Sequence, residues 1–338
     1  IYYAAVDAVT GATTEYDMQS IFKLGGFLAL GASWTYQPAI LSSEICMFIS
    51  SEGEVVAYSG NTPADWSMIA RFVTGRPMGY RSLVQLENDL LLITDQGIIS
   101  LVELFSTAST LSSERIGQKI NKRIRQAAAI SGFDHRWHGK YWPNGTAAYI
   151  NIPNGADNYY LVLNILTGAW CEYRFNTLKL ASCLEVLDAQ PYCGDGAGVV
   201  RKFEVASSDD SGIPISISWR SSWNFLESRG NFKVMSDARP LIYGPAIFKI
   251  YQGVDTDFKT GSIMSSITLT ALSSGSSSST PWGSSWGSSW SAGSQYYTKR
   301  VGLTGQGHSI SYKLSGDFSN TDLEINAVDL RYEIGSMV

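Results

Sequence analysis

Two histidines and an aspartate stand close together at residues 134–138 and are the first candidates for chemistry. Imidazole and carboxylate groups are common metal ligands, so Asp134, His135 and His138 could form a metal site in a loop. In a strand, residues three apart point to opposite faces, and the two histidines could not easily share a metal there. We expect ordinary hairpin residues and predict no metal site.

Two glycine-containing patterns resemble catalytic or phosphate-binding motifs. Residues 283–287 match the G-x-S-x-G pattern of a nucleophile elbow, but they lie in a Ser/Gly repeat instead of between a strand and a helix. Residues 194–198 resemble a phosphate-binding glycine loop, but no helical pattern follows them, and a hairpin turn is expected. No nucleophile, base and metal occur together in a suitable context. We therefore predict no catalytic residues, no enzyme activity and no cofactor.

A predicted helix at residues 111–129 combines an apolar stripe with a basic surface. Ile116, Ile120 and Ile124 recur at every fourth residue. The other faces carry Arg115, Lys119, Lys122, Arg123 and Arg125. These cations could contact nucleic-acid phosphates, or they could face water or an acidic partner while the isoleucines pack on a neighbour. We predict the second arrangement, with the isoleucines at a contact within or between subunits.

Residues 273–294 are rich in Ser and Gly and contain Trp282, Trp286 and Trp290 at a spacing of four. Exposed tryptophans on a β-protein could stack on sugars. The alternative is an irregular loop pinned by its indole rings against its own or a neighbouring subunit. Ordering each backbone residue costs about 1–2 kcal/mol, and only these large side chains can offset that cost. We predict the pinned loop, at a subunit interface or at the rim of a conduit.

Most of the remaining chain predicts β-hairpins that turn at glycines. Apolar runs flank turns within residues 48–66, 90–101, 147–163 and 192–200. Gly53 and Gly97 are 44 residues apart, and Gly155 and Gly196 are 41 apart. Propeller blades repeat at about 40–50 residues, so the pattern predicts a propeller-like array of hairpin blades.

The domain organisation follows from changes in these patterns. The polar, turn-rich residues 206–214 predict a linker. Period-two alternation after it, as at 215–219, predicts a β-sandwich or barrel-like domain. We expect hairpin blades at 1–110, one isolated helix at 111–129, further blades at 130–205 and the second β domain at 206–338. So few blades would not close a propeller, and we expect the true N-terminus to be missing.

Composition favours a mainly β protein and argues against several other classes. The 338 residues are 44% hydrophobic and 12% aromatic, which suits strands. A net charge of −5 argues against a protein that coats DNA. The most apolar run, residues 24–32, is too short to span a membrane. The four cysteines lack CxxC spacing, which argues against a zinc site or a disulfide scaffold.

A series of short motifs, taken in order, resembles a known family. They are FKLGG (22–26), GASWT (31–35), SEGEV (51–55), YSGNTP (58–63), GRPMG (75–79), DLLLIT (89–94), NILTGAWC (164–171), YCGD (192–195), DSG (210–212) and the tryptophans from Trp282. This order is similar to that of the tail tubular (nozzle) proteins of short-tailed bacteriophages and related prophages. The chain departs from the family at residues 36–38 and after each tryptophan, where acidic residues are usual.

The resemblance implies a structural protein of the virion tail with a β-propeller and a further β domain. Such proteins form a ring, typically a homohexamer, below the portal adaptor, where they contact adaptor or portal-side proteins and tail fibres. The ring is a conduit for DNA ejection, so DNA passes without stable binding. An acidic lumen would let DNA slide because it repels phosphates. The family implies no catalytic residues. The alternative function is a glycan-binding propeller of a tail fibre or a cell-surface adhesin.

Overall fold

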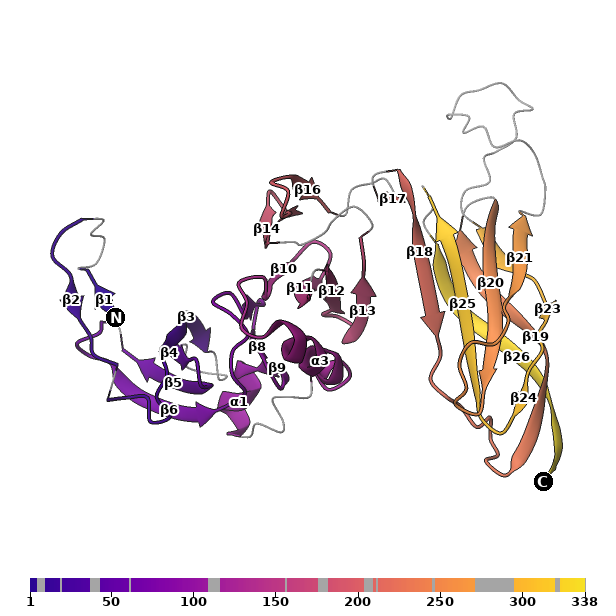
Figure 1. Ribbon diagram of the computed structural model, residues 1–338, viewed down its shortest axis with the longest axis horizontal. Helices are drawn as coiled ribbons and strands as arrows, with labels where there is room; N and C mark the ends of the chain where they lie inside the picture. The colour runs from indigo at the N-terminus through magenta and orange to yellow at the C-terminus, as the bar shows by residue number, and fades with distance from the viewer. Residues whose placement is uncertain are drawn as a thin grey trace, which may run out of the picture. The chain divides into compact units, whose positions relative to one another are not determined.

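The structure, a computed structural model, is mainly β and divides into two compact units, Ile1–Glu204 and Val205–Val338 (Figure 1). It describes residues 1–4, 10–18, 20–36, 43–60, 62–108, 116–155, 157–175, 182–203, 209–210, 212–244, 247–270, 295–319 and 323–337. The division between the units lies beside the predicted linker at 206–214. Part of that linker belongs to a sheet: β17 (Asp209–Asp210) pairs with the start of β18 (Ile213–Arg220).

Among the described residues of the first unit, four antiparallel sheets have three or four strands each, and strands consecutive in sequence are hydrogen-bonded neighbours. The first sheet comprises β3 (Leu28–Tyr36), β4 (Ser43–Ser50), β5 (Glu54–Ser59) and β6 (Ser67–Val73), and the second comprises β7 (Leu83–Gln85), β8 (Leu90–Thr94) and β9 (Gly97–Ser100). The third comprises β10 (His138–Trp142), β11 (Ala147–Asn154), β12 (Asp157–Asn164) and β13 (Ala169–Tyr173), and the fourth comprises β14 (Cys183–Leu187), β15 (Gln190–Gly194) and β16 (Val200–Lys202). A separate pair is formed by β1 (Tyr2–Tyr3) and β2 (Thr14–Glu15). The hairpins predicted around Gly53, Gly97, Gly155 and Gly196 are confirmed.

Apolar clusters join these sheets face to face in chain order. On β8, Leu90 and Leu92 belong to a cluster shared with the first sheet, whereas Leu91 and Ile93 belong to a cluster shared with the third. Successive side chains on a strand point to opposite faces, so both faces of the second sheet are buried. Burial on both faces explains the uninterrupted apolar run of β8. Another cluster joins the opposite face of the third sheet to the fourth, through Tyr149, Tyr160, Leu184 and Cys193 among others.

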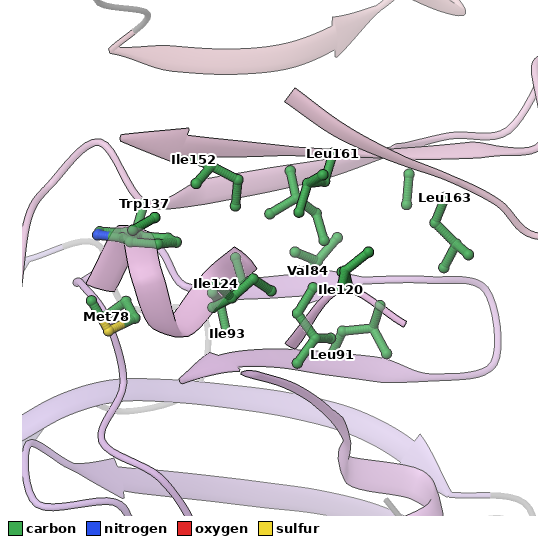
Figure 2. Close-up of a cluster of buried hydrophobic side chains, with 14 of the residues drawn as sticks. Met78, Val84, Leu91, Ile93, Ile120, Ile124, Trp137, Ile152, Leu161 and Leu163 are labelled. Atoms are coloured by element: carbon green, nitrogen blue, oxygen red, sulfur yellow. The ribbon is translucent and has the colours of Figure 1, made fainter. Parts of the chain in front are cut away.

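The cluster between the second and third sheets is called the central cluster here. Figure 2 shows its side chains between the strands that bear Leu91 and Ile93 and those that bear Ile152 and Leu161. It consists of Met78, Val84, Leu91, Ile93, Ile98, Ile120, Ile124, Ala127, Trp137, Ala148, Ile150, Ile152, Tyr159, Leu161 and Leu163.

The predicted helix is shorter than expected, because α3 spans Asn121–Ser131. Residues 109–115 lie outside the described part of the chain, and residues 116–120 form turns. Gly117 accepts hydrogen bonds from the backbone N–H groups of Ile120 and Asn121, both at 2.8 Å. The buried Asn121 side chain then accepts the N–H of Ile98 at 3.2 Å. This tertiary contact sets the start of the helix.

A second helix, α1 (Leu101–Thr107), lies where only hairpins were predicted, so the expectation of one isolated helix is wrong. Its N-cap is Ser100, whose Oγ accepts the N–H of Glu103 at 3.0 Å. Ser followed three residues later by Glu is the sequence pattern of a capping box. Leu101 and Leu104 are buried against the first two sheets, which ties α1 to the stack.

The second unit consists of two antiparallel sheets that share one core. Its first sheet runs in the order β17, β18, β25 (Ile310–Phe318), β20 (Ile247–Thr256) and β21 (Ser265–Thr270). In its second sheet, β19 (Asn231–Gly244) pairs with β26 (Glu324–Met337) and with β22 (Gln295–Thr298), β23 (Val301–Gly302) and β24 (Gln306–Gly307). Both sheets contribute to the core, for example through Ile242 and Leu314. Within the described residues, no sheet closes into a barrel.

Replacing Gly53 by alanine is expected to destabilise the first unit more than the same change at Gly198. Both glycines lie in turns with left-handed backbone, at φ +84° and +80°, and an L-residue there costs about 1–2 kcal/mol. A Cβ at Gly53 would lie 2.6 Å from the carbonyl oxygens of Thr74 and Gly75, whereas one at Gly198 meets nothing within 4 Å. The clash should add about 1–3 kcal/mol. Urea unfolding of both variants measures the difference, and equal losses would disprove the role of this close approach.

Candidate assembly surfaces

The predicted isoleucine stripe lies in the core of its own unit. Ile120 and Ile124 are buried in the central cluster (Figure 2). Ile116 is half-buried against the same cluster. The backbone carbonyl of Ile116 accepts the indole N–H of Trp170 at 2.9 Å. Of the two predicted kinds of contact, the one within the subunit is therefore present. Ile120 and Ile124 keep little exposed surface for a contact with another subunit.

The basic surface of α3 and its preceding turn faces away from this core. Lys119, Lys122 and Arg125 are exposed. Arg123 forms an ion pair with Glu172 of β13, so this cation is shared with a neighbouring strand. Lys119, Lys122 and Arg125 have no ion pair among the described residues and can meet an acidic partner or water, whereas Arg115 lies outside the described residues.

The predicted tryptophan interface lies outside the described residues. Trp282, Trp286 and Trp290 all fall in the stretch 271–294, as does the G-x-S-x-G match at 283–287. Their expected position at a subunit interface stays a prediction.

The polar side chains at residues 134–138 form hydrogen bonds with one another and with the backbone. Asp134 is held by the guanidinium of Arg136, with its two oxygens 2.8–3.1 Å from the donating nitrogens. These hydrogen bonds lower the pKa of the Asp134 carboxyl. His138 is buried and donates from Nδ1 to the Arg136 carbonyl at 2.8 Å, whereas His135 is exposed. Burial lowers the pKa of His138 to about 4 and keeps it neutral. Across the described ranges, no group of three or more His, Cys, Asp or Glu side chains is placed to hold a metal.

The glycine-rich stretch 194–198 is the turn between β15 and β16. The carboxylate of Asp195 accepts the backbone N–H groups of Ala197 and Val199, both at 2.9 Å, and pairs with Arg201 at 3.3 Å. These hydrogen bonds lower the pKa of Asp195. A phosphate loop needs free backbone N–H groups, and this turn already uses two of them on its own carboxylate.

The carboxylates beside a cavity of about 300 Å³ in the first unit also have structural partners. Glu87 accepts the hydroxyl of Tyr141 at 3.1 Å. Asp89 accepts the N–H groups of Leu90 and Val102 at 2.7 and 3.2 Å, which holds the start of α1. Both carboxylates therefore stabilise connections between elements.

Phe27, Tyr80 and Phe133 form an exposed aromatic cluster on the first unit. The three side chains are 50%, 58% and 44% exposed. Their ring centroids are 4.9 Å apart for Tyr80 and Phe133, and about 6 Å apart for the pairs with Phe27. A backbone hydrogen bond from Asp134 to Met78, at 2.9 Å, holds two of the three segments together. Contiguous exposed aromatic surface is typical of contact sites between proteins.

No family model matches this chain, and no curated protein matches it. In the part of the chain that the structure describes, neither helix has the length and apolar character needed to cross a membrane.

The aromatic cluster could not be found in the sequence because its members lie far apart and each is unexceptional alone. The fold is what brings them together.

Proposed function

We propose that this chain is a structural subunit of a tail nozzle ring in a short-tailed bacteriophage, where the ring forms the conduit for DNA ejection. We also propose that the four sheets of the first unit are consecutive blades of a propeller-like array, and that the second unit is a β-sandwich. The function rests on the ordered family motifs described above together with this sheet arrangement.

The face-to-face stack of four consecutive sheets is the observation that carries the proposal. Propeller blades are antiparallel sheets of about four strands, each formed by one stretch of chain and packed against the blades beside it. The second and third sheets are buried on both faces, as internal blades require. The outer face of the first sheet packs Phe48, Val56 and Tyr58 against Met18, so this face is also covered by preceding chain.

A ring of such subunits needs contact surfaces and a lumen that does not retain DNA. The aromatic cluster of Phe27, Tyr80 and Phe133 supplies apolar contact area for a neighbouring virion protein or subunit. The net charge of −5 suits a conduit, because strong Lys and Arg contacts would hold the phosphates. The proposed location is accordingly the virion tail.

Imaging and mass measurement of the purified chain test the proposal. We expect closed rings of about six copies with an open centre, as the family resemblance implies. The double variant Tyr80→Ser/Phe133→Ser should lose assembly while keeping its circular-dichroism spectrum. Leu166→Ser, at a 79% exposed position in the β12–β13 turn, is the matched control and should assemble normally.

A stable monomer or trimer would contradict the nozzle role. Binding of such a species to immobilised glycans would instead support the alternative, a glycan-binding propeller of a tail fibre or surface adhesin.

A further inference from the structure

Strand β18 of the second unit carries apolar side chains that face inward without being covered. Ile215 and Trp219 pair with Phe318 and Leu314 of β25, which belong to the core. Directly opposite residues on neighbouring strands have side chains on the same face, so Ile215 and Trp219 also point toward the opposite sheet. They are nevertheless 43% and 44% exposed.

The opposite wall is formed by β26, and the two strands enclose a groove. A cavity of about 530 Å³ lies between them, lined by Trp219, Tyr312, Ile325, Val328 and Leu330 among others. We call it the β18–β26 groove. Asn326 lines it at a register shift, because Ala327 pairs with Leu241 and Ile325 with Ile242. Such bulges re-aim strand side chains and are common next to functional sites.

Both strands that border the groove have an open edge among the described residues. β17 pairs only with Ile213 and Pro214, so residues 215–220 of β18 have no strand beyond them, and β26 pairs only with β19. Proteins protect exposed edges with charges, prolines or bulges. Pro214 and Arg220 lie at the two ends of β18, but the stretch from Ile215 to Trp219 between them has neither a charge nor a proline, so this stretch is open to pairing with another strand.

We propose that the β18–β26 groove receives residues 271–294 of a second copy of this chain, which add an extended strand along β18. These 24 residues join β21 to β22. β21 lies at the edge of its sheet opposite to β18, and β22 pairs with β19 on the side away from β26. The two described strands that the segment connects therefore lie on the side of the unit away from its own groove. Head-to-tail association, as in a ring, brings that side to the groove of the next copy.

The composition of the segment suits the groove. In an extended strand, residues four apart lie on the same face, so Trp282, Trp286 and Trp290 would all enter from one side. The intervening residues are Gly and Ser, and residues 271–294 carry no charge, which suits the uncharged stretch Ile215–Trp219 of the β18 edge. Strand addition supplies main-chain hydrogen bonds, while pockets for alternate side chains supply specificity. An indole buries about 150–250 Å² and would fill the space beside Trp219.

Cysteine cross-linking of the full chain tests this arrangement. Ser284→Cys and Asn326→Cys are combined in a background in which the exposed Cys171 and Cys183 are replaced by serine. Mild oxidation should yield a ladder of covalent multimers, and neither cysteine alone should do so. Trp219→Asp, which places a charge in the groove at a lining position that is 44% exposed, should abolish the ladder. Ser218→Asp, on the outward face of β18, should leave it intact.

Three other outcomes of the cross-linking experiment would overturn the inference. A monomer with an internal disulfide would mean that the segment fills the groove of its own copy. No cross-link would mean that the groove does not receive the segment, and a soluble sugar that suppresses the cross-link would make the groove a glycan site. The inference rests on the self-association of the proposed ring but not on its viral role. Closed rings without cross-links refute only the inference, whereas cross-linked particles that are not rings refute only the nozzle.

Discussion

Replacing Ile124 by aspartate is expected to unfold the first unit under conditions in which the unchanged chain is folded. Ile124 is fully buried in the central cluster between the second and third sheets. The substitution loses about 1.5–3 kcal/mol of apolar burial, and an unpaired carboxylate in this core costs several kcal/mol more. Their sum is comparable with the whole stability of a typical domain, about 5–15 kcal/mol.

Ile130 provides a matched control on the same helix. It is 63% exposed, so Ile130→Asp should change the free energy of unfolding by about 1 kcal/mol or less, including the effect of a negative charge near the C-terminus of α3. Lys122→Glu, on the exposed face, should also have a small effect. Urea unfolding followed by circular dichroism measures all three variants. If charge reversal at Lys122 proved as harmful as Ile124→Asp, α3 would have an electrostatic role instead of a packing role.

The β-hairpins could be predicted because their signals are local. The run Leu90–Thr94, the turn glycine and the run after it fix β8 and β9 without knowledge of the rest of the fold. The isoleucine spacing likewise predicted that Ile120 and Ile124 are buried, although only Ile124 lies within α3. The start of α3 could not be predicted, because it depends on the contact between Asn121 and Ile98, which are far apart in sequence. Helix α1 was missed although its capping pattern at Ser100 and Glu103 is local.

The candidate surfaces were harder to predict because each depends on several distant segments. Phe27, Tyr80 and Phe133 lie on three segments that are distant in sequence, and they form one cluster only after the fold has brought these segments together. Trp219 lies in a strand whose alternation is visible in the sequence, but its exposure arises because no described strand lies beyond residues 215–220 of β18, which only the strand order reveals. Periodicity identifies which side chains share a face, and only the topology decides whether that face is covered.

Asp255→Asn is expected to destabilise the second unit by about 3–5 kcal/mol, the usual cost of removing one partner of a buried ion pair. Asp255 is 1% exposed. Its Oδ1 accepts hydrogen bonds from Ser262 Oγ at 2.6 Å and from Lys313 Nζ at 3.0 Å, and its Oδ2 lies 3.6 Å from Arg220. The amide would leave the largely buried Lys313 ammonium without a counter-charge. Asp329→Asn is the matched control, because Asp329 pairs with Arg239 at the surface. It should cost about 0–1 kcal/mol.

The pH dependence of the stability lost in Asp255→Asn shows whether the loss comes from the charge of Asp255 or from its shape. Burial alone would raise the pKa of Asp255, but hydrogen bonds from Ser262 and Lys313 outweigh burial and lower it to about 2. In the unfolded chain its pKa is about 3.9. Between these values the unfolded state binds the proton and the folded state does not, so the contribution of Asp255 is complete above about pH 5 and is lost as pH falls through 2, at up to about 1.4 kcal/mol per pH unit. The stability gap between the unchanged chain and Asp255→Asn, measured by urea unfolding, should therefore narrow by about 2 kcal/mol from pH 5 to pH 2. A gap that stays constant over this range would show that the lost stability comes from packing and not from the carboxylate charge.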